Sequence, residues 1–111
     1  MYKKVYCNDL ILADKVKIAN NFFKRFIGLM GKKSLAEGEG LLLWHCSSIH
    51  CFFMKIPIDA IYVSSDMTVL GKETIQPWHL GKHFKKTAHV LELGADTAYS
   101  KVSIGDKIYF K

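Results

Sequence analysis

The segment from His45 to Val63 gathers most of the residue types in this chain that can do chemistry. It holds two histidines, two cysteines, a methionine and an aspartate within a largely apolar run. Burying such polar groups costs free energy unless each one finds a partner. The segment therefore either lines a site at the surface or carries buried polar groups with specific partners.

A soft metal ion is the first chemistry that this segment suggests, since thiolates and imidazoles are ligands of zinc and copper. The candidate ligands are Cys46, His50 and Cys51. Residues four apart on a strand are separated by about 13 Å, whereas a zinc–ligand bond is about 2 Å long. Cys51 also points to the opposite strand face from the other two. The three side chains can reach one ion only if the chain bulges or folds back near residues 47–48. We therefore expect no metal cofactor, and zinc or copper binding stays an alternative.

A histidine oriented by a carboxylate is the second chemistry, and this arrangement is common in general bases and in ligand-binding sites. Asp59 shares a predicted strand face with Ile61 and Val63. Asp59 approaches His50 if the strands that flank Pro57 pair with each other or curl. Asp59 and His50 are then candidates for a general base with its orienting carboxylate, or for a ligand-binding site.

Glu92 lies in a similar apolar run, and Arg25 is a natural partner for either carboxylate. One interpretation is a ligand pocket lined by His50, Met54, Asp59 and Glu92. The other is a buried network of ion pairs and hydrogen bonds that fixes the fold, with Asp59 bound to backbone amides near the neighbouring proline bend. We favour the network, because structural networks also perturb pKa values.

The loop from Gln76 to Lys86 places aromatic side chains beside positive charge. Trp78 and Phe84 could stack on sugars or bases, and the lysines could hold an anion. Alternatively, both aromatic side chains simply cover one end of a barrel. Trp78 is the candidate binding residue of this loop.

Composition sets the broad class of the protein. The chain has 111 residues, the size of one domain, which we place at 1–111, and half of them are hydrophobic. The formal charge of +6 comes from scattered basic residues, a pattern that argues against a nucleic-acid footprint. We find neither a signal peptide nor an apolar run of membrane-spanning length. We therefore expect a cytoplasmic monomer whose three cysteines are free thiols.

Short apolar or alternating runs predict many strands, and one run with helical spacing predicts a helix. The helix begins at Asn20 or Asn21 and ends near Gly31, with apolar residues at three-to-four spacing. A short helical turn is expected within 94–102. The predicted strands are Lys3–Cys7, Leu10–Leu12, Lys15–Ala19, Leu41–Trp44, Ile49–Met54, Ile58–Val63, Thr68–Ile75, Ala88–Leu93 and Lys107–Phe110. The fold class is a β-rich α+β domain, a small and mostly antiparallel barrel or curled sheet with one helix in its N-terminal half.

Five motifs in a fixed order resemble those of a widespread bacterial and archaeal family, domain of unknown function 192. They cover nearly the whole chain, and the ordered set is far more specific than any single motif. The motifs are Arg25–Met30, Leu35–Leu41, His50 with Met54–Asp59, Val90–Leu93, and Gly105–Asp106. The resemblance implies a compact β-rich fold with one early helix, and it implies no activity, substrate or cofactor.

We expect a non-enzymatic ligand-binding or accessory module with a cleft near His50, Met54, Asp59 and the Trp78 loop. Its partner would be a small molecule, a glycan or a peptide. One alternative is a small hydrolase or lyase that uses His50 with Asp59 or Glu92, although no complete catalytic constellation is visible. Soft-metal binding is the other alternative.

Overall fold

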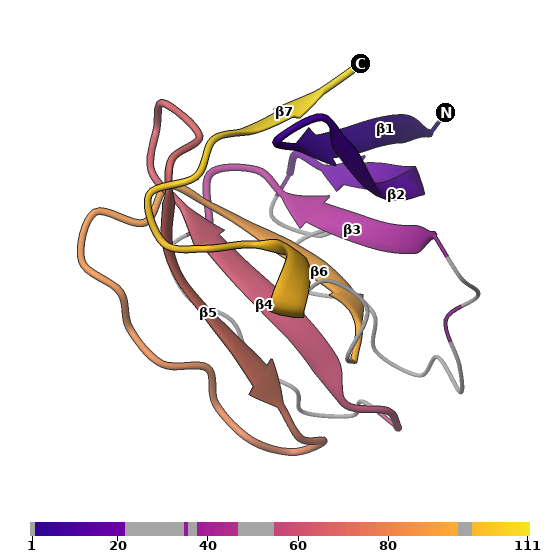
Figure 1. The fold of residues 1–111 in the computed structure, drawn as a ribbon. Coiled ribbons are helices and arrows are strands. Elements are labelled where there is room, and N and C mark those ends of the chain that lie inside the picture. The colour runs from indigo at the N-terminus through magenta and orange to yellow at the C-terminus, as the bar shows by residue number, and fades with distance from the viewer. Residues whose placement is uncertain (1, 22–34, 36–37, 47–54, 96–98) are drawn as a thin grey trace.

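Seven strands make up the computed structural model, which describes residues 2–21, 35, 38–46, 55–95 and 99–111 (Figure 1). A single turn of 3₁₀-helix, η1, follows the sixth strand. The elements are β1 (Lys3–Cys7), β2 (Leu10–Ala19), β3 (Glu39–Leu43), β4 (Ile58–Val63), β5 (Val69–Ile75), β6 (His89–Gly94), η1 (Tyr99–Lys101) and β7 (Ile108–Phe110).

The strands form one sheet in the order β5-β4-β6-β3-β2-β1-β7. Every neighbouring pair is antiparallel except β2 and β3, which are parallel. A parallel pair cannot be joined by a tight turn, so the chain crosses over between them through residues 20–38. The central strands β4 and β6 lie between partners on both sides and carry the two buried carboxylates of the predicted site.

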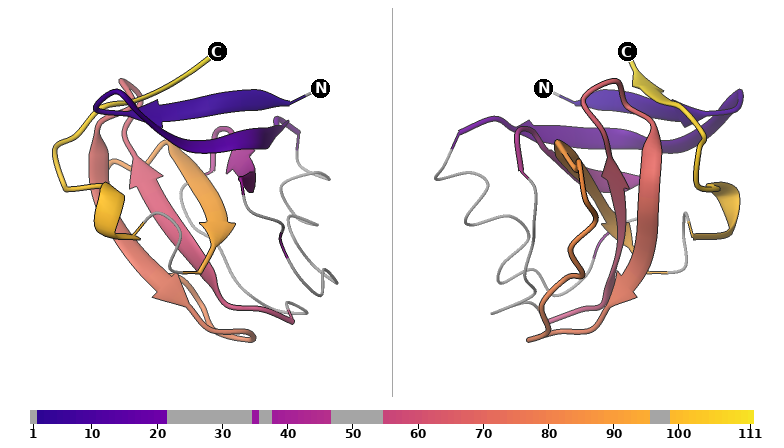
Figure 2. Two further views of the ribbon diagram at one scale, coloured as in Figure 1. Left: turned by 45° about the vertical axis from the view of Figure 1, so that its right-hand side comes forward. Right: turned by 90° about the vertical axis from the view of Figure 1, so that its left-hand side faces the viewer.

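The sheet curls until its two edges meet at one end (Figure 2). Thr68 and Lys107 form an isolated antiparallel bridge just before β5 and β7. The N–H of Val69 donates to the carbonyl of Asp106 at 2.8 Å, and the N–H of Ile108 donates to the carbonyl of Met67 at 2.9 Å. The result is a partly closed barrel, in which fewer backbone groups are left at an open edge.

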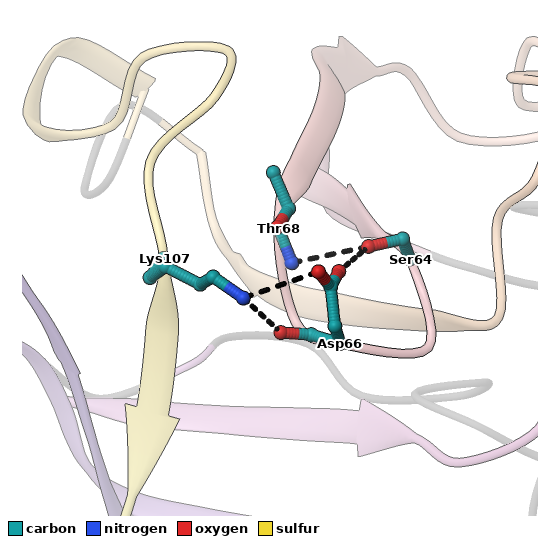
Figure 3. A network of polar contacts seen from close by, with 4 residues as sticks. All are labelled: Ser64, Asp66, Thr68 and Lys107. Atoms are coloured by element: carbon teal, nitrogen blue, oxygen red, sulfur yellow. Dashed lines mark hydrogen bonds and ion pairs between the residues drawn. The ribbon is translucent and has the colours of Figure 1, made fainter.

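A polar network reinforces this closure (Figure 3). The ammonium group of Lys107 donates to the backbone carbonyl of Asp66 at 2.9 Å and to its carboxylate at 3.2 Å. The Asp66 carboxylate also accepts from the Ser64 hydroxyl, whose oxygen in turn accepts from the N–H of Thr68 at 3.2 Å. The β4–β5 turn is thereby tied to the start of β7.

Apolar side chains cover both faces of the central strands, and all six residues of β4 are buried. We call the cluster inside the curl the inner core, because it joins side chains from the two edge strands as well as from the middle of the sheet. It consists of Val5, Cys7, Leu12, Ala13, Val16, Leu42, Ile61, Val63, Val69, Leu91, Leu93, Val102 and Ile108. The cluster on the other face, the outer core, consists of Ala19, Leu41, Leu43, Ile58, Ala60, Tyr62, Ile75 and Val90.

The predicted curled β-rich sheet is confirmed, with changes in detail. Two predicted strands, Leu10–Leu12 and Lys15–Ala19, are parts of the single long strand β2. The predicted strand 49–54 falls outside the described residues, as does nearly all of the predicted helix. The described ranges contain no α-helix, only η1, so the one-helix detail of the expected α+β class is not confirmed. These ranges also hold no helix long and apolar enough to cross a membrane.

Candidate functional site

Strand register decides where the two predicted carboxylates point. On β4, Asp59 lies opposite Leu93, whereas on β6 Glu92 lies opposite Ala60. Residues paired across a ladder share a sheet face, and successive residues alternate between faces. Asp59 therefore points to the inner core, with Ile61, and Glu92 points to the outer core. The two carboxyl groups do not share a pocket.

Asp59 is 1% exposed and makes hydrogen bonds through both carboxylate oxygens. The Thr74 hydroxyl donates to Oδ1 at 2.7 Å, and the N–H of Tyr99 donates to Oδ2 at 3.2 Å. Lys72 Nζ approaches the same turn, donating to the carbonyls of Tyr99 and Val102, the latter at 2.6 Å. Asp59 and Lys72 thus fix η1 by its amide and its carbonyl groups. A backbone amide is among the Asp59 partners, although it belongs to Tyr99 rather than to the bend at residue 57.

Glu92 has a different environment on the other face. Its side chain is 4% exposed, and among the described residues Oε1 has no hydrogen-bond partner. Its ladder neighbours are the apolar residues Leu41 and Ala60. Burial raises the pKa of Glu92 from 4.5 to about 8. The group is therefore a neutral acid at pH 7, able to donate a proton or a hydrogen bond.

The loop 76–86 is held against the outer face of β4 and β5. Glu73 Oε2 accepts from the Tyr62 hydroxyl at 2.6 Å and from the N–H of Lys82 at 2.7 Å. The ring of Phe84 lies 4.6 Å from that of Tyr62. A Cβ at Gly71 would come within 2.2 Å of the Phe84 ring. The glycine therefore makes room for Phe84, and β5 continues through this position.

Trp78, the candidate binding residue of this loop, lies in its exposed first part. It is 58% exposed, and Leu80 beside it is 69% exposed. The backbone of Trp78 has a φ of +67°, in a turn where the N–H of His79 donates to the carbonyl of Gln76 at 3.2 Å. A bulky residue seldom adopts a positive φ, and such strained positions cluster at functional sites.

A buried histidine forms a third polar feature, which the sequence analysis did not single out. His89 is 2% exposed, and its ring stacks on that of Trp44 with centroids 3.7 Å apart. Its Nδ1 accepts from the N–H of His45 at 2.9 Å, which leaves the proton of the neutral ring on Nε2. Burial and the neighbouring charge of His45 lower the pKa of His89. The only sequence signal was a histidine at the start of an apolar strand.

Two of the three cysteines, Cys46 and Cys7, lie in the described residues. Cys46 is half-buried against the outer core, and Cys7 is buried. Burial, helped by a hydrogen bond to Asp106, raises the pKa of Cys7 to about 11 and so makes the thiol unreactive. In the part of the chain that the structure describes, no three His, Cys, Asp or Glu residues are placed to hold an ion. Four predicted site residues lie outside these ranges, namely Arg25, His50, Cys51 and Met54.

Comparison with known proteins agrees with this fold and supplies a family. The model of domain of unknown function 192, described as "Uncharacterized ACR", matches residues 7–110. A UPF0127 protein of Pyrococcus abyssi is 34% identical over 102 residues, which are 85% of this chain and 84% of that protein. A second, from Pyrococcus horikoshii, is 34% identical over 98 residues and covers 85% of each chain.

A solved structure shares the architecture. This protein of unknown function from Novosphingobium aromaticivorans superposes with a TM-score of 0.84 at 21% identity, over 96% of this chain and 82% of that one. At that identity the likeness concerns the fold alone. The chain belongs to the uncharacterised family of domain of unknown function 192.

Proposed function

We propose that this protein is a non-enzymatic binding module whose contact surface is the loop Gln76–Lys86. The observation that carries the proposal is Trp78, a bulky side chain that is 58% exposed on a backbone of positive φ. A side chain that is mostly in water buries little apolar area in the fold, and a positive φ is uncommon for a bulky residue. Exposed tryptophan is instead typical of residues that dominate binding energy.

The loop meets a second requirement of a binding surface, which is order before the partner arrives. Its middle is fixed by the contacts of Lys82 and Phe84 with the sheet. Its end is fixed by Thr87, whose N–H and hydroxyl both donate to the carbonyl of Phe84 at 3.2 and 2.6 Å. Little conformational entropy is then lost on binding, which favours affinity. The partner class is a small molecule, a glycan, a peptide or another surface that Trp78 can contact.

Binding to three kinds of probe tests the proposal: arrayed glycans, arrayed peptides, and vesicles that contain phosphatidylserine. We expect Trp78→Ala to weaken binding to the responding probe by about tenfold or more, since an aromatic contact contributes roughly 1–3 kcal/mol. Tyr2→Ala is the matched control, because Tyr2 is 54% exposed elsewhere on the surface. Melting temperatures of both variants should match that of the parent. The proposal fails if no probe binds, or if the binding observed is insensitive to Trp78→Ala.

A small hydrolase or lyase is the second candidate function, and Glu92 is the observation in its favour. A buried acid with a raised pKa is suited to general-acid catalysis. Turnover of a panel of small esters and amides tests this candidate. Glu92→Gln should abolish any turnover found, while circular dichroism shows an unchanged fold. Turnover that survives in Glu92→Gln would remove Glu92 from the chemistry.

A further inference from the structure

We propose that the partner of the Gln76–Lys86 loop is an anionic lipid surface, into whose interface Trp78 and Leu80 insert. This inference rests on the proposed function of the loop as the contact surface, and it names the class of partner. The protein would bind the membrane peripherally, through one loop.

The exposed apolar side chains favour lipid over the other partners. Trp78 and Leu80 lie two residues apart and are 58% and 69% exposed. A sugar ring or a nucleic-acid base stacks on tryptophan but offers no comparable contact for an aliphatic side chain. Tryptophan is enriched at the membrane–water interface, and aliphatic side chains beside it bury apolar area among the acyl chains. A lipid interface therefore accounts for both residues at once.

The charges of the loop select anionic lipid. Lys82, Lys85 and Lys86 are all exposed, and the sequence from 76 to 86 contains no aspartate or glutamate. The nearby carboxylate of Glu73 accepts hydrogen bonds from the loop and from Tyr62, so it is occupied in holding the loop in place. Each lysine close to an anionic membrane strengthens binding by about fivefold. The apolar pair Trp78 and Leu80 and the three lysines that follow it supply buried apolar area and electrostatic attraction, the two terms on which interfacial binding depends.

The loop runs along the outside of the edge strand β5, on the side of the molecule away from both termini (Figure 1). It is held to the sheet at Lys82 and Phe84, so insertion of its tip need not disturb the barrel.

Sedimentation with vesicles tests the inference, with phosphatidylcholine alone compared with phosphatidylcholine mixed with phosphatidylserine. We expect the parent protein to bind the anionic vesicles and to dissociate as salt is raised. Leu80→Ser should weaken binding by about tenfold, through loss of buried apolar area. Ile104→Ser is the matched control, because Ile104 is 70% exposed on a turn far along the chain and should leave binding unchanged. Lys82→Gln, Lys85→Gln and Lys86→Gln should each reduce binding by about fivefold.

Quenching by brominated lipid locates the inserted residue. The chain has two tryptophans, and the other, Trp44, stacks on His89. The lipid should quench the parent protein but leave the emission of Trp78→Phe unquenched. Equal binding to neutral vesicles, or no effect of Leu80→Ser, would overturn the inference.

Other partners produce other results. Absence of vesicle binding together with glycan or peptide binding that depends on Trp78 overturns the lipid inference and leaves the proposed function standing. Single-stranded DNA binding that Leu80→Ser does not alter also overturns the lipid inference, in favour of a nucleic-acid partner. If no probe binds in a way that depends on Trp78, both proposals fail.

Discussion

Two buried carboxyl groups on adjacent strands show what burial alone does and does not decide. Asp59 on β4 and Glu92 on β6 are 1% and 4% exposed. Asp59 accepts hydrogen bonds through both oxygens, from Thr74 and from the backbone of Tyr99. Glu92, among apolar neighbours, has an oxygen without a partner in the described residues, and its pKa is raised to about 8. The difference lies in the partners that each sheet face provides.

Asp59 has a structural role that its contacts explain, whereas the burial of Glu92 has no such explanation. Asp59 holds η1 over the inner face, so its role in the fold follows from its contacts. Glu92 fixes no described element, and a buried oxygen that finds no partner within the described ranges calls for an explanation. Function, if it resides in a buried carboxyl group here, is therefore to be sought at Glu92 before Asp59.

The largest expected effect is the pH dependence that Glu92 gives to stability. Its pKa is raised on folding, so the unfolded chain releases the proton first, and the folded state loses stability as pH rises from 4.5 to about 8. The slope is at most about 1.4 kcal/mol per pH unit. Urea unfolding of the parent and of Glu92→Gln at several pH values measures it. Parallel stability curves for the two proteins would show that Glu92 is not buried as a neutral acid.

The next effect is the loss of Asp59. Asp59→Ala leaves a buried hydroxyl and a buried amide without an acceptor, which we expect to cost about 3 kcal/mol. The melting temperature should fall by about 15 °C. Asp59→Asn is the control, because its amide can accept from Tyr99 and donate to Thr74, and its loss should be about 1 kcal/mol. If alanine were tolerated as well as asparagine, the hydrogen bonds of Asp59 would not hold η1.

Replacing Glu92 by an apolar residue of similar length should have the opposite sign. Glu92→Met removes Oε1, which has no hydrogen-bond partner in the described part of the chain, and keeps an apolar side chain in the outer core. Near pH 4.5, where ionisation contributes little, we expect a gain of about 1 kcal/mol in the free energy of unfolding. Thermal unfolding should register it as a rise of about 5 °C. A destabilised Glu92→Met would indicate that Glu92 has a stabilising partner after all.

Much of the fold could be predicted from the sequence, because local alternation signals part of β2 and continuous apolar runs signal the buried strands β3 and β4. Lys15 and Lys17 alternate with buried Val16 as β2 requires, and Asp59 lies on the face of Ile61 as expected. Register between strands could not be predicted. It depends on which residue of β6 meets which residue of β4, and it alone places Glu92 on the opposite face.

The candidate site was predictable only in part, for similar reasons. The loop that holds Trp78 could be predicted from its proline, glycine and polar residues, whereas the sequence left open whether Trp78 is exposed or covers a barrel end. The contact of Asp59 with Tyr99 joins residues forty apart in the sequence, and no local pattern signals it. The stacking of His89 on Trp44 likewise depends on the pairing of β3 with β6. Long-range pairing therefore decides which polar groups find partners.

The smallest expected effect concerns Asp66, which has partners without burial (Figure 3). Hydrogen bonds from the side chains of Ser64, then Thr68, then Lys107 hold the pKa of this exposed carboxyl well below its ordinary value of 3.8. A lowered pKa stabilises the fold above the ordinary value, and the contribution disappears as pH falls through the folded value. Asp66→Asn should therefore lower the melting temperature slightly at pH 7 and by less below pH 3.8. Water screens the site, so the change in melting temperature should be far smaller than that of Asp59→Ala.

An NMR titration ranks the causes of the lowered pKa. Ser64→Ala should raise the pKa of Asp66 more than Lys107→Gln does. The reverse order would make the ion pair, rather than the hydroxyl, the main cause.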